Sequence, residues 1–99
     1  MTNRFFLTSI LLVCFQFSNA QDSLSFLALG DCYTIGESVL ANERWPVQLA
    51  DSLNNRGYKV SDPLIIAQTG WRTDELKAAI QARNPHKNYD LVGLLIGVN

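Results

Sequence analysis

Three apolar runs alternate with two amphipathic stretches along the chain. The first run, from Ser25 to Gly30, is unbroken and closed by glycine, which is typical of a strand buried on both faces. A second strand is expected over residues 58–67, with its buried part at 64–67. A third is expected over residues 89–98, as an apolar strand at the edge of a sheet.

The first amphipathic stretch predicts a helix that begins at Trp45-Pro46, because proline is well tolerated in a first helical turn. Gly57 is expected to stop it. The segment before it, residues 32–41, is expected to be a loop. The side chains expected to form the buried face of this helix are Trp45, Val47, Leu49, Ala50 and Leu53.

The second amphipathic stretch predicts a helix capped by Thr73, whose hydroxyl can accept a bond from a free backbone N–H. Asp74 and Glu75 then lie in the first turn, where negative charge suits the helix dipole. Asn84-Pro85 ends the helix. Its inward stripe is expected to consist of Leu76, Ala79 and Ile80.

The expected order is therefore β-α-β-α-β, which indicates an α/β fold with a parallel sheet and right-handed crossovers. Ligands of such sheets bind at the carboxyl ends of the strands. The loops after the three strands contain Cys32, Gly70 and Asn99. We expect these three residues to meet at one edge of the sheet.

The N-terminal segment has the pattern of a cleaved export signal. Arg4 precedes an apolar stretch at residues 5–17, and Ser18-Asn19-Ala20 then has small residues at the positions that a signal peptidase reads. The apolar stretch is shorter than the roughly 20 residues that span a bilayer. We therefore predict a signal peptide at 1–20, a single domain at 21–99, a secreted or periplasmic location, and no stable membrane span after cleavage.

Charge and motif spacing disfavour two other classes of function. The net charge is −1 and no basic stripe is present, which argues against a nucleic-acid partner. The first loop lacks the spacing Gly-x-Gly-x-x-Gly, and Glu37 follows Gly36 where a phosphate-binding loop has lysine. A nucleotide- or flavin-binding domain is therefore disfavoured.

Three short motifs follow the three expected strands. They are Gly-Asp-Cys-Tyr-Thr-Ile-Gly-Glu at 30–37, Gln-Thr-Gly at 68–70 and Ile-Gly-Val-Asn at 96–99. In this order they resemble the first three blocks of the SGNH hydrolases, also called GDSL-type esterases and lipases, over residues 25–99. The resemblance implies a flavodoxin-like three-layer sandwich, here truncated after the third strand, and hydrolysis of acyl or acetyl esters.

The resemblance also implies the roles of individual residues. Cys32 stands at the nucleophile position, where the family has serine, while the Gly70 backbone N–H and the Asn99 side chain correspond to oxyanion-hole donors. No cofactor or metal is implied, and the substrate would be a small-molecule, lipid or carbohydrate ester.

The family's fourth block, which supplies histidine and aspartate, has no match in this sequence. The single histidine, His86, precedes the third strand, whereas the active edge lies after it. We therefore expect the chain as it stands to be inactive as an esterase. The alternative is a non-catalytic module that binds carbohydrate or lipid on the same fold.

Cys32 has three interpretations: a natural thiol nucleophile, a replacement that silences or alters the site, or a buried inert thiol. Cys14 would leave with the signal, so Cys32 would have no partner for an internal disulfide. Trp45 and Trp71 are expected to be packing residues, and Arg72 a solvated side chain.

Overall fold

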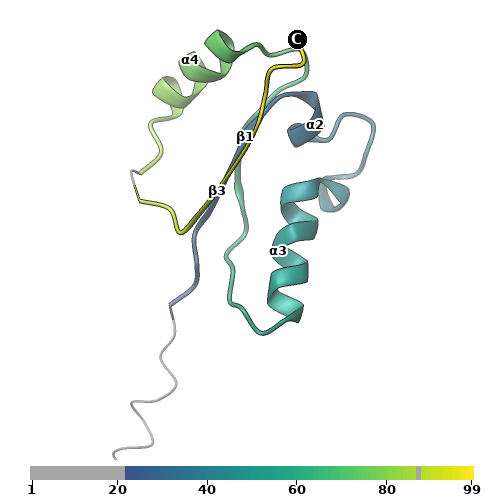
Figure 1. Cartoon of the computed structure of the whole chain (residues 1–99), viewed down its shortest axis with the longest axis vertical. Helices are drawn as coiled ribbons and strands as arrows, with labels where there is room; N and C mark the ends of the chain where they lie inside the picture. The colour runs from purple at the N-terminus through teal and green to yellow at the C-terminus, as the bar shows by residue number, and fades with distance from the viewer. Residues whose placement is uncertain (1–21, 87) are drawn as a thin grey trace, which may run out of the picture.

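The computed structural model describes residues 22–86 and 88–99, so the predicted signal peptide lies outside the described part. Its centre is a parallel sheet of strands β1 (Phe26–Gly30), β2 (Leu64–Ala67) and β3 (Leu91–Leu95), in the order β2-β1-β3 (Figure 1). The prediction of an α/β fold with a parallel sheet is confirmed.

Two longer helices lie on opposite sides of this sheet: α3 (Trp45–Asn55) on one and α4 (Thr73–Arg83) on the other (Figure 1). A four-residue helix, α2 (Cys32–Ile35), and a 3-10 turn, η1 (Ala41–Glu43), lie between β1 and α3. Within residues 22–86 and 88–99, no helix is long and apolar enough to cross a membrane.

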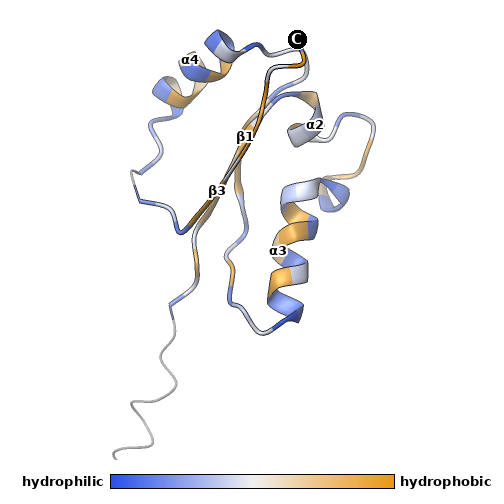
Figure 2. Cartoon of the chain, in the orientation of Figure 1, coloured by the Kyte–Doolittle hydropathy of each residue, from blue (hydrophilic) through white to orange (hydrophobic). Residues whose placement is uncertain are grey.

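The core is divided in two by the sheet, because successive side chains of β1 point to opposite faces. Strands are hydrophobic along their length, whereas both long helices mix hydrophobic and hydrophilic residues (Figure 2). On the α3 side the buried residues are Phe26, Ala28, Ala50 and Val60, with Trp45 and Leu53 packed against them. On the α4 side they are Leu27, Ile66 and Leu76, joined by Trp71, Ala79 and Ile80. The packing roles predicted for both tryptophans and the inward stripe of α4 are confirmed.

Two strands are shorter than predicted. Pro63 has no N–H to donate, and β2 begins directly after it. Before Pro63, only an isolated bridge between Leu24 and Val60 remains. The third strand ends at Leu95 because its only described neighbour, β1, ends at the paired Gly30.

Three local predictions were wrong. The expected loop at 32–41 contains helix α2, which begins behind an Asp31 side-chain cap. Thr73 does not cap α4: it is the first helical residue, the N-cap is Arg72, and no side chain caps this end. Leu49 is exposed rather than buried, because the three-stranded sheet is too narrow to cover the full apolar face of α3.

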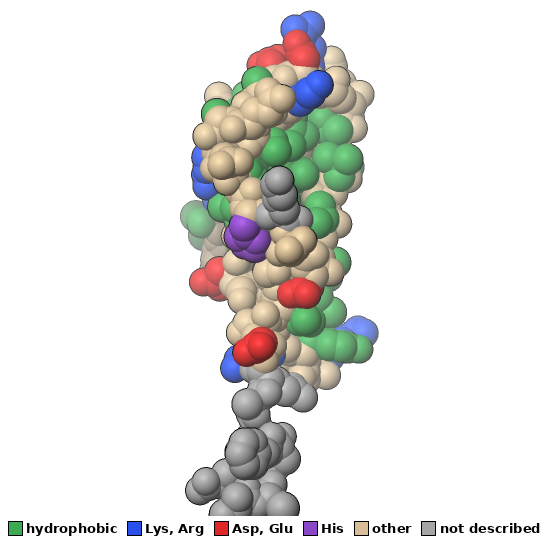
Figure 3. Space-filling view, turned by 90° about the vertical axis from the view of Figure 1, so that its left-hand side faces the viewer, with side chains coloured by type: hydrophobic (Ala, Val, Ile, Leu, Met, Phe, Trp, Pro, Cys, Tyr) green, Lys and Arg blue, Asp and Glu red, His purple; other side chains and the backbone are tan. Residues whose placement is uncertain are grey.

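The edge strand β3 leaves apolar side chains uncovered, as expected from its sequence. Figure 3 shows hydrophobic side chains gathered on the face of the molecule beside α4. Parallel sheets are normally covered on both faces, so this edge is the part of the fold most prone to association. The exposed side chains are Val92 (54 %), Leu94 (64 %) and Leu95 (44 %) in β3 and Val98 (61 %) in the segment after it.

A polar clamp joins the starts of β1 and β3. The Asp90 carboxylate accepts bonds from the Ser25 backbone N–H at 2.8 Å and from its hydroxyl at 3.1 Å, while the Asp90 N–H donates to that hydroxyl.

We expect Asp90→Ala to lower the free energy of unfolding by about 1 kcal/mol, because these bonds are solvent-exposed. Urea denaturation measures this loss. Asp62→Ala, at an exposed carboxylate without such bonds, serves as the control, and an equal effect of both substitutions would contradict the clamp.

Candidate functional site

The carboxyl ends of all three strands lie at one edge of the sheet, because the strands are parallel. The loop after β1 begins α2 with Cys32, the loop after β2 contains Gly70, and the segment after β3 contains Asn99. The last two segments touch directly: the Asn99 side-chain N–H₂ donates to the Trp71 carbonyl at 3.1 Å. The topology thus brings the three predicted residues to the same edge.

The turn into α2 is held by Asp31. One carboxylate oxygen accepts the Tyr33 backbone N–H at 3.1 Å, and the Asp31 carbonyl accepts N–H groups of Thr34 and Ile35 at 3.0 and 2.9 Å. Gly36, with a φ of 76°, ends the helix in the left-handed conformation that glycine adopts most readily. Cys32 is therefore the first residue of one tightly fixed helical turn.

Asp31 is a residue whose importance the sequence reasoning missed. Its side chain is fully buried, and the second carboxylate oxygen has no hydrogen-bond partner among the described residues. Buried polar atoms are nearly always paired, so this oxygen marks an unusual position at the base of the turn. The sequence signal was present: aspartate is among the preferred residues at a helix N-cap.

Cys32 is a free cysteine with a half-buried side chain. It lies between the buried Asp31 and Tyr33, whose side chain is 63 % exposed. Part of its surface reaches solvent at the edge formed by the carboxyl ends of the strands. This exposure agrees better with the two interpretations that place Cys32 in a site than with a buried inert thiol.

Helix α3 holds the turn that carries Cys32 through a side-chain hydrogen bond. Thr34 is fully buried, and its hydroxyl accepts the indole N–H of Trp45 at 3.3 Å. The Trp45 ring in turn packs against Phe26 of β1, with ring centroids 6.2 Å apart. The position of Cys32 is thereby coupled to the core.

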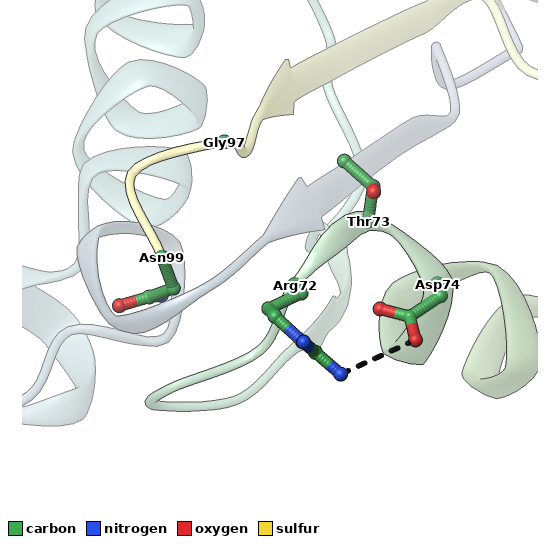
Figure 4. A pocket seen from close by; sticks show the side chains of 5 residues that line it. All are labelled: Arg72, Thr73, Asp74, Gly97 and Asn99. Carbon is green, nitrogen blue, oxygen red and sulfur yellow. Dashed lines mark ion pairs between the residues drawn. The ribbon is translucent and has the colours of Figure 1, made fainter.

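A polar pocket of about 370 Å³ opens between the start of α4 and the segment after β3 (Figure 4). We call it the strand-end pocket. It is lined by Arg72, Thr73, Asp74, Gly97 and Asn99. It contains Asn99, one of the predicted oxyanion donors, whereas Cys32 and Gly70 are not among its lining residues.

Gly70 and Gly97 both have positive φ angles, 82° and 114°. A Cβ at either position would meet no atom within 4 Å among the described residues, so conformation rather than space requires glycine there. Gly70 is the residue whose backbone N–H the resemblance assigns to the oxyanion hole.

His86 lies at the other end of the sheet, in the connection between α4 and β3. Its ring stacks on Tyr89, with centroids 4.1 Å apart. Since β3 begins at Leu91 and runs parallel to β1, His86 is separated from the Cys32 edge by the length of a strand. The predicted location of His86 is confirmed.

Comparison of the chain with known proteins found no similar protein. No protein-family model matches the chain, and no curated protein or solved structure matches it.

Proposed function

We propose that this chain forms the nucleophile-bearing part of an exported ester hydrolase of the SGNH type, with Cys32 at the nucleophile position. The proposal includes the flavodoxin-like arrangement of the family and the export signal predicted at residues 1–20. Gly70 and Asn99 are assigned as oxyanion donors.

One observation carries the proposal: the residues at the three motif positions follow three adjacent parallel strands and lie at one edge of the sheet. Two further features support it. The Cys32 turn is held by hydrogen bonds to Asp31 and is partly open to solvent, and the Asn99 residue lines a pocket at that edge. One bond from the Asn99 amide goes to the Trp71 carbonyl, which fixes the amide plane and leaves its second N–H to meet an oxyanion.

The chemistry available to these residues is acyl transfer to sulfur. The Cys32 sulfur bonds to the ester carbonyl carbon, the bond to the alkoxy oxygen breaks, and the alcohol leaves with the thiol proton. The product is a thioester on Cys32. Donors directed at the developing oxyanion lower such a barrier by about 3 kcal/mol each.

Release of the acyl group by water would require a general base within hydrogen-bond reach. His86 cannot serve, because it stacks on Tyr89 at the opposite end of the sheet. We therefore propose that this chain becomes acylated and does not turn over. The same observation favours the second candidate, a non-catalytic module that binds an ester or its alcohol part at this edge.

The test is acylation of the 99-residue chain by p-nitrophenyl acetate. We expect release of no more than one p-nitrophenolate per chain and an acetyl group that peptide mass spectrometry locates on Cys32. Cys32→Ala should abolish this release, and His86→Ala should leave its rate unchanged. The rate should exceed that of the same chain unfolded in urea.

Two results would refute the proposal. One is acetylation of Cys32 that is no faster in the folded chain than in the unfolded chain. The other is sustained turnover that is lost in His86→Ala, which would show that His86 acts as the base despite its place at the opposite end of the sheet.

A further inference from the structure

The residues that line the strand-end pocket have polar side chains, apart from Gly97, which has no side chain. The start of α4 supplies the guanidinium of Arg72, the hydroxyl of Thr73 and the carboxylate of Asp74, while the segment after β3 supplies the amide of Asn99 (Figure 4). Hydrogen-bond donors and acceptors therefore lie on both sides of the space. An acyl chain would require the apolar lining that typical lipid and drug sites have.

The charges of the pocket nearly cancel. The Arg72 guanidinium lies 3.5 Å from the Asp74 carboxylate and 3.4 Å from that of Glu75. These three groups sum to a formal charge of −1, and the α4 N-terminus opposes it with a partial positive charge of about one half. Neither an anion nor a cation is strongly favoured.

The ion pairs of Arg72 are also weak. Its side chain is 63 % exposed and those of Asp74 and Glu75 are 69 % and 45 % exposed, a setting in which such pairs contribute about 0–1 kcal/mol. A neutral ligand can therefore share these donors and acceptors at little cost. Hydroxyl groups suit them, because each hydroxyl both donates and accepts.

We infer that the strand-end pocket binds a neutral, hydroxyl-rich ring, so that the ester handled at this edge is an ester of a sugar-like polyol. The inference rests on the proposed function for the position of the ester. The pocket volume of about 370 Å³ lies at the lower end of the range of roughly 300–1,000 Å³ for small-molecule sites, which suits a single ring better than a long chain.

The test is a titration of the ¹⁵N-labelled 99-residue chain, followed by amide chemical shifts. The probes are the methyl glycosides of glucose, galactose, mannose and xylose, with 1-hexanol, sodium acetate and sodium phosphate for comparison. We expect at least one glycoside to shift amides at 72–74 and 97–99. Thr73→Val should weaken that binding about fivefold, the effect of one hydrogen bond, while Thr69→Val outside the pocket lining should not.

Shifts at these amides with hexanol or an anion alone, or with none of the probes, would overturn the inference. The titration is repeated with Cys32→Ala, in which glycoside binding should persist. Acetylation of Cys32 without glycoside binding would refute only the polyol site. Glycoside binding without acetylation would refute the esterase proposal and leave a carbohydrate-binding module.

Discussion

Gly30→Ala is expected to lower the free energy of unfolding by about 3 kcal/mol or more. An added Cβ would lie 2.5 Å from the Leu95 carbonyl oxygen and 2.7 Å from the Thr34 Cβ. Overpacking of this kind costs about 1–3 kcal/mol where side chains can shift, and more where they cannot. Here one obstacle is the backbone of β3, which is held in register with β1.

The measurement is urea denaturation followed by tryptophan fluorescence, with Gly57→Ala as the matched control. Gly57 has a φ of 94° and open space around it, so alanine there meets only the conformational penalty of about 1–2 kcal/mol. Equal losses at the two positions would show that the close approach at Gly30 does not exist. A loss at Gly30 clearly larger than the one at Gly57 would confirm that the strand end before Cys32 admits glycine alone.

The arrangement of strands and helices could be predicted because apolar runs and helical periodicity are local signals. The lengths of the strands could not, because they depend on pairing between segments far apart in the chain. Asp90 illustrates this: the residue was counted within a strand, yet its side chain bonds to Ser25, 65 positions away, and β3 begins after it.

The elements missed were those with too few residues for a period to be visible. Helix α2 has four residues, and its only sequence signal is the capping Asp31. Leu49 shows the opposite error: periodicity identified the apolar face of α3, but the extent of the sheet decides which part of that face is covered.

For the candidate site, the sequence predicted which loops meet, because parallel strands place their carboxyl ends together. It did not predict the strand-end pocket. That space depends on how the segment after β3 lies against the loop after β2. The Asn99 side chain bonds to the Trp71 carbonyl, and Ile96 and Trp71 both pack against the same apolar cluster. Contacts of this kind have no periodic signal in the sequence.

Trp45→Ala is expected to destabilise the fold by about 3 kcal/mol, the lower end of the range for a tryptophan removed from a core, because Trp45 is only partly buried. The ring fills the space over Gly93, where an added Cβ would lie 2.6 Å from its Cη2 atom, and it packs against Phe26. Loss of the ring would separate α3 from two strands at once.

Trp45→Phe separates this packing from the hydrogen bond to the Cys32 turn. Phenylalanine retains much of the ring contact but has no N–H for the Thr34 hydroxyl, so we expect a loss of about 1 kcal/mol in urea denaturation. The rate at which iodoacetamide labels Cys32 in the native chain should also change, because the turn loses its tie to α3. Trp71→Phe, on the opposite face of the sheet, should leave that rate unaltered. Identical labelling rates in Trp45→Phe and the unmodified chain would mean that α3 supports the sheet alone and does not set the position of Cys32.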